Sequence, residues 1–280
     1  MIRPARLLLL AALMLGGCGS APERQAGEIV IGTEGAYPPW NFTRADGSLA
    51  GFEPDLLAAL CPRAGLKCRL VAQDWNGMIG ALDAKKIDVI ADSVVITPAR
   101  RDVVTFSRPY ARTTSIFVTA DPAMAAAFAG VTGNIDYDRP GPAFDRRMAA
   151  LRRVLRGRTI GVQASGVYEE YLNAHLAGVA TVRTYRTAGE RDLDLLLGRV
   201  DLTLEDSAYM KPLLAAPGSE TLRIVGPALS GGMFGAGEAF AVRKGDVAMK
   251  ARLDTALAAL IADGTVRRLS LKWLHEDATP

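Results

Sequence analysis

The stretch WNGMIGALDAKKIDVIADSVVITPARR, residues 75–101, decides the fold. Its first part, 75–86, has the apolar spacing of a helix, whereas 87–96 ends in β-branched residues and has the composition of a buried strand. Another strand-like run, 67–73, precedes the helix. A strand, a helix and a strand in this order predict a βαβ unit, and such units build parallel sheets.

The alternation continues in both directions along the chain. Upstream, a strand-like run at 28–33 precedes a helical segment at 51–65. Downstream, strands and helices alternate at 158–163, 167–176, 182–187, 190–197 and 200–205, and a strand at 240–243 is followed by a helix at 248–264 and a last short helix. Two α/β runs in succession predict two lobes.

Residues 121–157 interrupt the alternation with an alanine-rich stretch, a Gly/Pro/Asp loop and the basic segment FDRRMAALRRVLR. We interpret that segment as a helix with a solvated arginine face, whose inward face carries Met148, Leu151 and Leu155. The whole chain has 280 residues, 22% charged residues and a net charge of +3. Because acids and bases alternate and no basic stripe appears, we expect no nucleic-acid partner.

The N-terminus has the composition of an export signal. MIRPAR is followed by the apolar run LLLLAALML, small residues and Cys18. This run is shorter than the roughly 20 residues that span a bilayer, so 1–17 indicates a signal peptide rather than the alternative of a membrane helix. LGGC resembles the bacterial lipobox, which predicts a lipid on Cys18, a tether over 18–27 and attachment to a membrane.

Two cysteines remain, Cys61 and Cys68, seven positions apart. In an exported protein an even pair this close favours a local disulfide. Two thiols without a nearby histidine are too few ligands for a zinc site, and we predict no metal.

The candidate site lies where the predicted strands end, because ligands of open α/β sheets bind beyond the carboxyl ends of the strands. The loops there offer Glu34, Tyr37, Trp75, Asp92, Ser93, Arg100, Asp206 and the backbone amides of Ser165, Gly166 and Val167. An arginine and helix amides suit a carboxylate, an acid suits an ammonium, and aromatic rings suit the rest of a zwitterion.

Seven ordered motifs extend this pattern over the chain: GTEGAYPPWNF, DGSLAGFEPDLLAALC, DWNGMIGALDAKKIDVIADSVVITPARRDVVTFSRPY, GVQASG, GRVDLTLED, GPALSGGMFG and LSLKWL. With them the chain resembles the polar amino-acid-binding group of bacterial periplasmic solute-binding proteins. It is most similar to the octopine/nopaline-binding branch, and next to the lysine/arginine/ornithine- and histidine-binding proteins.

The resemblance implies a two-lobed periplasmic-binding-protein fold of type II. Each lobe is a mostly parallel sheet flanked by helices, and two crossing segments form the hinge. Lobe 1 would comprise 27–110 and the return segment 237–280, and lobe 2 would comprise 111–236. Cys61 and Cys68 fall where the family has its lobe 1 disulfide.

The family's binding roles carry over to matching residues. Arg100 is expected to grip the ligand's α-carboxylate, Asp206 to accept from its α-ammonium and Ser93 to add a backbone acceptor. Tyr37 and Trp75 would enclose the ligand's side chain, and Glu34 would meet a distal cation. The alternatives are a surface arginine at 100, core packing of the two aromatic residues and a plain loop acid at 34.

Four positions depart from the family pattern. Val95 stands where a serine is usual, and Gly166 and Val167 replace a threonine pair, so backbone amides remain without hydroxyl groups. Asp92 stands where serine or alanine is common, close to the expected side-chain pocket. It would meet the ligand, or instead cap the following turn or pair with Arg101.

The acids set the expected ligand. Glu34, Asp92 and Asp206 face a single arginine, and three carboxylates repel one another unless a cation lies between them. We therefore predict a strongly cationic ligand: arginine, ornithine, lysine or a guanidino relative, with an opine as a further possibility.

The resemblance implies a monomeric binding protein that delivers its ligand to an ABC permease and ATPase. We expect no cofactor and no catalytic residue, because the chain has no nucleophile elbow, no HExxH and no P-loop. Two other functions stay open: a cyclohexadienyl (arogenate) dehydratase on the same scaffold, which would need a carboxyl as general acid, and a sensory ligand-binding domain.

Overall fold

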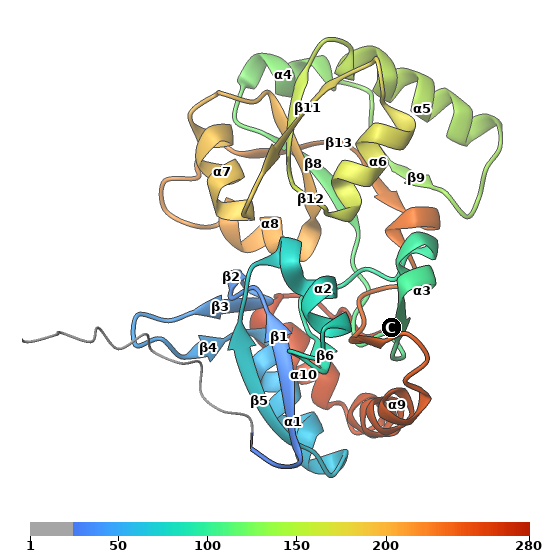
Figure 1. The fold of residues 1–280 in the computed structure, drawn as a ribbon. Helices are drawn as coiled ribbons and strands as arrows, with labels where there is room; N and C mark the ends of the chain where they lie inside the picture. Colours follow the sequence, from blue (N-terminus) through green and yellow to red (C-terminus); the bar gives the residue numbers. More distant parts are fainter. Residues whose placement is uncertain (1–24) are drawn as a thin grey trace, which may run out of the picture.

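The computed structural model describes residues 25–280. The predicted signal peptide, the lipid on Cys18 and the first part of the tether lie outside this range. Within it, no helix is long and apolar enough to cross a membrane. The chain forms two lobes, one above the other in Figure 1, each with its own sheet and hydrophobic core.

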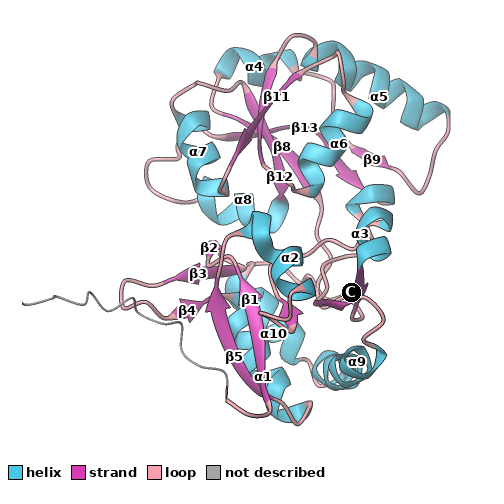
Figure 2. Cartoon of the chain, in the orientation of Figure 1, coloured by secondary structure: helices cyan, strands magenta, loops and turns pink. Residues whose placement is uncertain are grey.

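The first sheet has five strands in the order β5 (Lys67–Ala72), β1 (Glu28–Thr33), β6 (Val89–Ile90), β14 (Ala241–Arg243) and β7 (Val104–Phe106). The first three run parallel, and β14 runs antiparallel to both of its neighbours. The accompanying helices are α1 (Phe52–Arg63), α2 (Met78–Asp83), α3 (Pro98–Val103), α9 (Val247–Ala262) and α10 (Thr265–Trp273). A three-stranded sheet of β2 (Ala36–Tyr37), β3 (Asn41–Thr43) and β4 (Leu49–Ala50) lies beside them (Figure 2).

The second sheet has six strands in the order β11 (Thr181–Tyr185), β10 (Thr159–Gln163), β12 (Leu202–Asp206), β8 (Ser115–Thr119), β13 (Arg223–Ser230) and β9 (Asn134–Asp136). The helices of this lobe are α4 (Pro122–Ala127), α5 (Pro142–Leu155), α6 (Val167–His175), α7 (Ala188–Leu196) and α8 (Ser207–Leu214). Short 3₁₀ turns occur at Trp75–Gly77 and Gly232–Phe234. The two-lobed fold of mostly parallel sheets flanked by helices is therefore confirmed.

Two local predictions are also confirmed. Cys61 and Cys68 form a disulfide, which links the end of α1 to β5. On the basic helix α5, Met148, Leu151 and Leu155 are buried, as its apolar spacing indicates.

The predicted strand at 87–96 is wrong in its second half. Strand β6 already ends at Ile90, because Ser93 adopts φ 45 and interrupts the extended backbone. The carboxylate of Glu53 accepts a hydrogen bond from the Ser93 N–H (2.8 Å) and holds this bend. Tertiary contacts thus override the β-branched composition. Arg100 therefore lies on a helix, α3, and not at the end of a strand.

The backbone around Glu238 supports the predicted lobe boundaries. Ala111 and Glu238 form an isolated antiparallel bridge, and Val95 pairs with Glu238 in a second one. We propose that the chain crosses between the lobes at this bridge, which would make 27–110 and 237–280 the first lobe and 111–236 the second.

Candidate functional site

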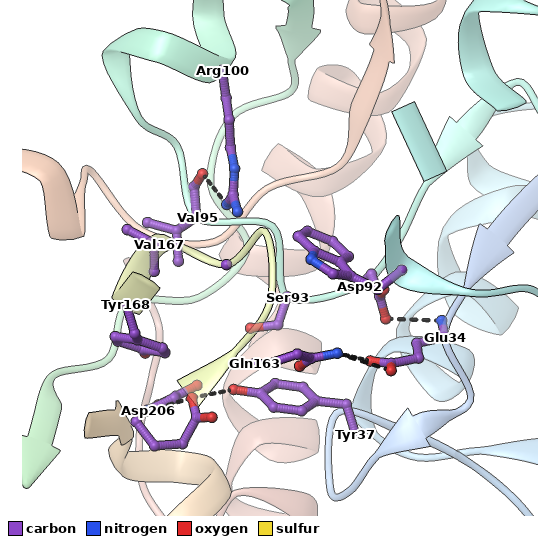
Figure 3. Close-up of a pocket in the computed structure, with 13 residues that line it drawn as sticks. Glu34, Tyr37, Asp92, Ser93, Val95, Arg100, Gln163, Val167, Tyr168 and Asp206 are labelled. Carbon is purple, nitrogen blue, oxygen red and sulfur yellow. Dashed lines mark hydrogen bonds between the residues drawn. The ribbon is translucent and has the colours of Figure 1, made fainter. Parts of the chain in front are cut away.

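A pocket lies between the two lobes, and both contribute to its wall (Figure 3). The first lobe provides Glu34, Tyr37, Trp75, Asp92, Ser93, Val95 and Arg100, and the second provides Gln163, Gly166, Val167, Tyr168, Glu205 and Asp206. Every predicted ligand-binding residue except Ser165 lines this pocket. Ser165 lines a neighbouring cavity, which shares Trp75 and Arg100 with the main pocket.

Arg100 is positioned by the start of α3. Thr97 caps the helix by accepting from the Arg100 N–H (3.2 Å), and the side chain then extends toward the pocket. Its Nη1 donates to the Val95 carbonyl (3.1 Å), and its guanidinium lies 5.3 Å from the centre of the Trp75 ring. Burial lowers the pKa of Arg100 to about 10, so the group is still charged at neutral pH. The guanidinium has five N–H donors, and most of them are left for an incoming carboxylate.

Asp206 ends strand β12 and caps helix α8. Its Oδ1 accepts from the Ala208 N–H (2.8 Å), and its Oδ2 accepts from the Trp40 indole N–H (2.8 Å). Burial, together with the charges of Glu238 and Glu205, raises its pKa well above the ordinary value. A cation beside this carboxylate would relieve that repulsion.

Asp92 holds the loop that follows β1. Its Oδ1 accepts from the Glu34 N–H (3.0 Å) and from the Asn41 side-chain amide (2.8 Å). The predicted alternatives, a cap on the following turn or a pair with Arg101, are therefore wrong, because this carboxylate bonds the preceding loop. Its Oδ2 is buried without a hydrogen-bond partner among residues 25–280. Burial and the charges of Glu53 and Glu34 raise the pKa of Asp92 well above its usual range.

Side chains meet across the pocket at two further points. Gln163 Nε2 donates to both carboxylate oxygens of Glu34 (2.9 and 3.0 Å), and burial raises the pKa of that acid. The Tyr37 hydroxyl donates to Glu205 Oε1 (2.7 Å), and its ring stacks on Tyr209 at 4.6 Å. These bonds join the first lobe to the second beside the pocket.

The amides at the start of α6 are only partly available. The Ser165 N–H donates to the carboxylate of Glu169 (2.6 Å), so a ligand would have to compete with Glu169 for this predicted donor. Gly166 and Val167 are the N-cap and first residue of α6 and line the pocket, where helix N-terminal N–H groups attract anions.

Sequence reasoning missed three lining residues, Gln163, Tyr168 and Glu205. Gln163 lies in the motif GVQASG, Tyr168 follows the predicted residue Val167, and Glu205 precedes Asp206 in the motif GRVDLTLED. The sequence did not indicate that Glu205 already has a counter-ion within the second lobe. The fully buried Arg191 donates to Glu205 and to Asp192. A partner 14 positions away gives no sequence signal.

No group of three or more His, Cys, Asp or Glu side chains within residues 25–280 has an arrangement that could hold a metal ion. The described pocket instead has three acids that form no salt bridge within residues 25–280, Glu34, Asp92 and Asp206, together with Arg100. This arrangement can hold a small molecule that carries both a carboxylate and positive charge.

Comparison with known proteins gives consistent results. The chain is 32% identical to the octopine-binding periplasmic protein of Rhizobium meliloti, over 100% of both chains. It is 34% identical to the L-arginine-binding protein of Pseudomonas aeruginosa, over 97% of both chains. Both relatives are binding proteins and not enzymes.

Solved structures share this two-lobed fold. A periplasmic His/Glu/Gln/Arg/opine family-binding protein from Silicibacter pomeroyi in complex with lysine superposes with a TM-score of 0.71 at 28% identity, over 90% of this chain and 99% of that one. An ancestral arginine-binding protein bound to arginine gives a TM-score of 0.72 at 26% identity, over 88% and 98%.

The family model of the bacterial extracellular solute-binding proteins, family 3, matches residues 29–276. That match covers every residue of the inter-lobe pocket and all of both sheets except Glu28, the first residue of β1. The chain belongs to family 3 of the bacterial extracellular solute-binding proteins.

Proposed function

We propose that this protein captures a cationic amino acid, such as arginine, ornithine or lysine, or a related opine, and delivers it to an ABC importer. The observation that carries the proposal is the unpaired, buried Oδ2 of Asp92 in a pocket that also contains Arg100. A buried carboxylate oxygen without a partner is costly, and a ligand cation would satisfy it.

The charges of the pocket favour a basic ligand over a neutral one. Glu205 already has Arg191 as its counter-ion. Within residues 25–280, Asp92 and Asp206 form no salt bridge, Glu34 has only the more distant charge of Arg186, and Arg100 is the basic residue of the pocket wall. The ligand's carboxylate would bind to Arg100, and its ammonium group would bind to Asp206. A side-chain cation would then lie between Asp92 and Glu34.

The lobes would close around the ligand as a hinge. Arg100 and Asp92 lie on the first lobe, whereas Asp206 and the α6 amides lie on the second, so only the closed form completes the site. A ligand that contacts both lobes shifts the population toward that form. We further propose export by the 1–17 segment, a lipid anchor on Cys18 that holds the protein at a membrane of the cell envelope, and docking of the closed form on a permease.

A thermal-shift panel tests the ligand class. We expect L-arginine, L-ornithine or L-lysine to raise the melting temperature of the protein, because a ligand that binds only the folded state stabilises it. The panel should include octopine, L-glutamine and prephenate, and calorimetry should then give the dissociation constant Kd of each hit. Stabilisation by none of the basic compounds would contradict the proposal, and turnover of prephenate would point to the dehydratase.

Substituting Asp92 tests the charge argument. Asp92→Asn keeps an acceptor for the Glu34 N–H but removes the negative charge, so we expect the Kd for L-arginine to rise by about 10- to 100-fold. The Kd for a neutral ligand such as L-glutamine should change much less. Because burial raises the pKa of Asp92, acidification should weaken arginine binding by the wild type, and the variant should lose part of that dependence.

Asp102→Asn is the matched control, since Asp102 is an exposed acid on the nearby helix α3. Its arginine affinity should equal that of the wild type. Equal losses of arginine and glutamine affinity in Asp92→Asn would rule out a role in charge selection.

A further inference from the structure

Trp40 connects the first lobe to the second through its indole N–H. It is fully buried in the core of the first lobe, where it packs edge-on against Phe52 with ring centres 5.4 Å apart. Its indole N–H, however, has its hydrogen-bond partner in the other lobe. It donates to Oδ2 of Asp206, on the last residue of β12, at 2.8 Å.

The first lobe fixes the position of this indole. The carbonyl of Trp40 accepts from the Glu53 N–H (2.9 Å), and the carbonyl of Pro39 accepts from the Phe52 N–H (2.9 Å), so the start of α1 holds the backbone on which the indole stands. Gly51 allows this close approach, because a Cβ at that position would lie 2.5 Å from the Trp40 carbonyl oxygen.

The second lobe fixes the acceptor equally well. Asp206 caps α8 through Ala208 and pairs with Ser115 at the start of β8, so the second sheet holds it in place. Ala208 itself packs against the first-lobe core cluster that contains Trp40. Both partners are therefore anchored, each in its own lobe. The Trp40–Asp206 hydrogen bond joins the two lobes, so a hinge motion that separates them would break it.

We propose that Trp40 is a positioning residue for the ligand's ammonium group, and that its indole N–H links the capture of this group to lobe closure. The inference rests on the proposed function, in which Asp206 accepts from the α-ammonium. Ala208 on one oxygen and Trp40 on the other fix the plane of this carboxylate, which lines the pocket. The Trp40 indole N–H thus also stabilises the ionised form of Asp206, whose neighbours Glu205 and Glu238 are both acidic.

The chain offers a matched control for this bond. The indole of Trp273, on α10, donates to Asp55 at 2.8 Å, which is the same chemistry at the same distance, but both residues belong to elements of the first lobe. Trp→Phe at either position removes one indole donor to a carboxylate. Only the substitution at 40 removes a bond between the lobes.

The test measures L-arginine binding by calorimetry and stopped-flow kinetics in Trp40→Phe, Trp273→Phe and the wild type. A hydrogen bond to a charged group predicts a Kd about 10- to 100-fold higher for Trp40→Phe, with most of the change in the dissociation rate. Trp273→Phe should bind within about twofold of the wild type, since its bond is unchanged by closure. Wild-type affinity and dissociation rate in Trp40→Phe would overturn the inference.

A second measurement covers the case in which Trp40→Phe fails to fold. In the wild-type protein, saturating L-arginine should slow hydrogen exchange at the Trp40 indole N–H far more than at the Trp273 indole N–H. Equal slowing at both would overturn the inference. A wild-type protein that binds no basic amino acid would instead overturn the proposed function, and this inference with it.

Discussion

Arg100→Ala should greatly weaken binding of L-arginine and of every other amino-acid ligand while leaving the fold intact. Removing one partner of a buried charge pair costs about 2–5 kcal/mol, which corresponds to a Kd about 30- to 4,000-fold higher. The fold should persist because, among the described residues, the guanidinium donates only to the Val95 carbonyl and contacts Trp75. Calorimetry with L-arginine and a thermal melt of the ligand-free protein measure the two effects separately.

Arg101→Ala is the control for this experiment. Arg101 is the next residue of α3 and is exposed, so its loss removes the same charge at nearly the same place without touching the pocket. Its Kd should match the wild type. Retained affinity in Arg100→Ala would refute direct binding of the ligand's carboxylate by Arg100. Equal losses of affinity in both variants would mean that only the positive charge near the pocket matters.

The large features of this fold could be predicted from sequence because they depend on local periodicity. Helix α5 was placed correctly, with Met148, Leu151 and Leu155 inward, because an amphipathic helix shows its buried face in its own spacing. The disulfide followed from spacing and compartment in the same way.

What could not be predicted depends on partners far apart in the chain. The bend at Ser93 needs Glu53, 40 positions earlier, and local β-propensity therefore extended the strand β6 too far. The sequence analysis assigns no role to Trp40, yet its indole donates to an acid 166 positions later. Sequence reasoning assembled most of the pocket wall from strand-end loops, but it gave no information on which acids already have a counter-ion.

Arg191 is the clearest case of such a hidden counter-ion, and Arg191→Met should destabilise the protein strongly. The side chain is fully buried, pairs with Glu205 and Asp192, and lies 5.2 Å from the Tyr209 ring centre. Breaking a buried ion pair from one side leaves uncompensated charge, so we expect the free energy of unfolding to fall by about 3–5 kcal/mol. Urea unfolding followed by circular dichroism measures this loss.

Two comparisons distinguish the two possible causes of the stability loss in Arg191→Met, an uncompensated buried charge and poorer packing. Arg199→Ala removes an exposed arginine that pairs with Asp194 at 2.9 Å in the same lobe, and surface pairs of this kind contribute about 0–1 kcal/mol. Adding Glu205→Gln to Arg191→Met should restore part of the stability, because the amide still accepts from Tyr37 and carries no charge. If the double variant is no more stable than Arg191→Met, the loss comes from packing around the methionine and the counter-ion argument is wrong.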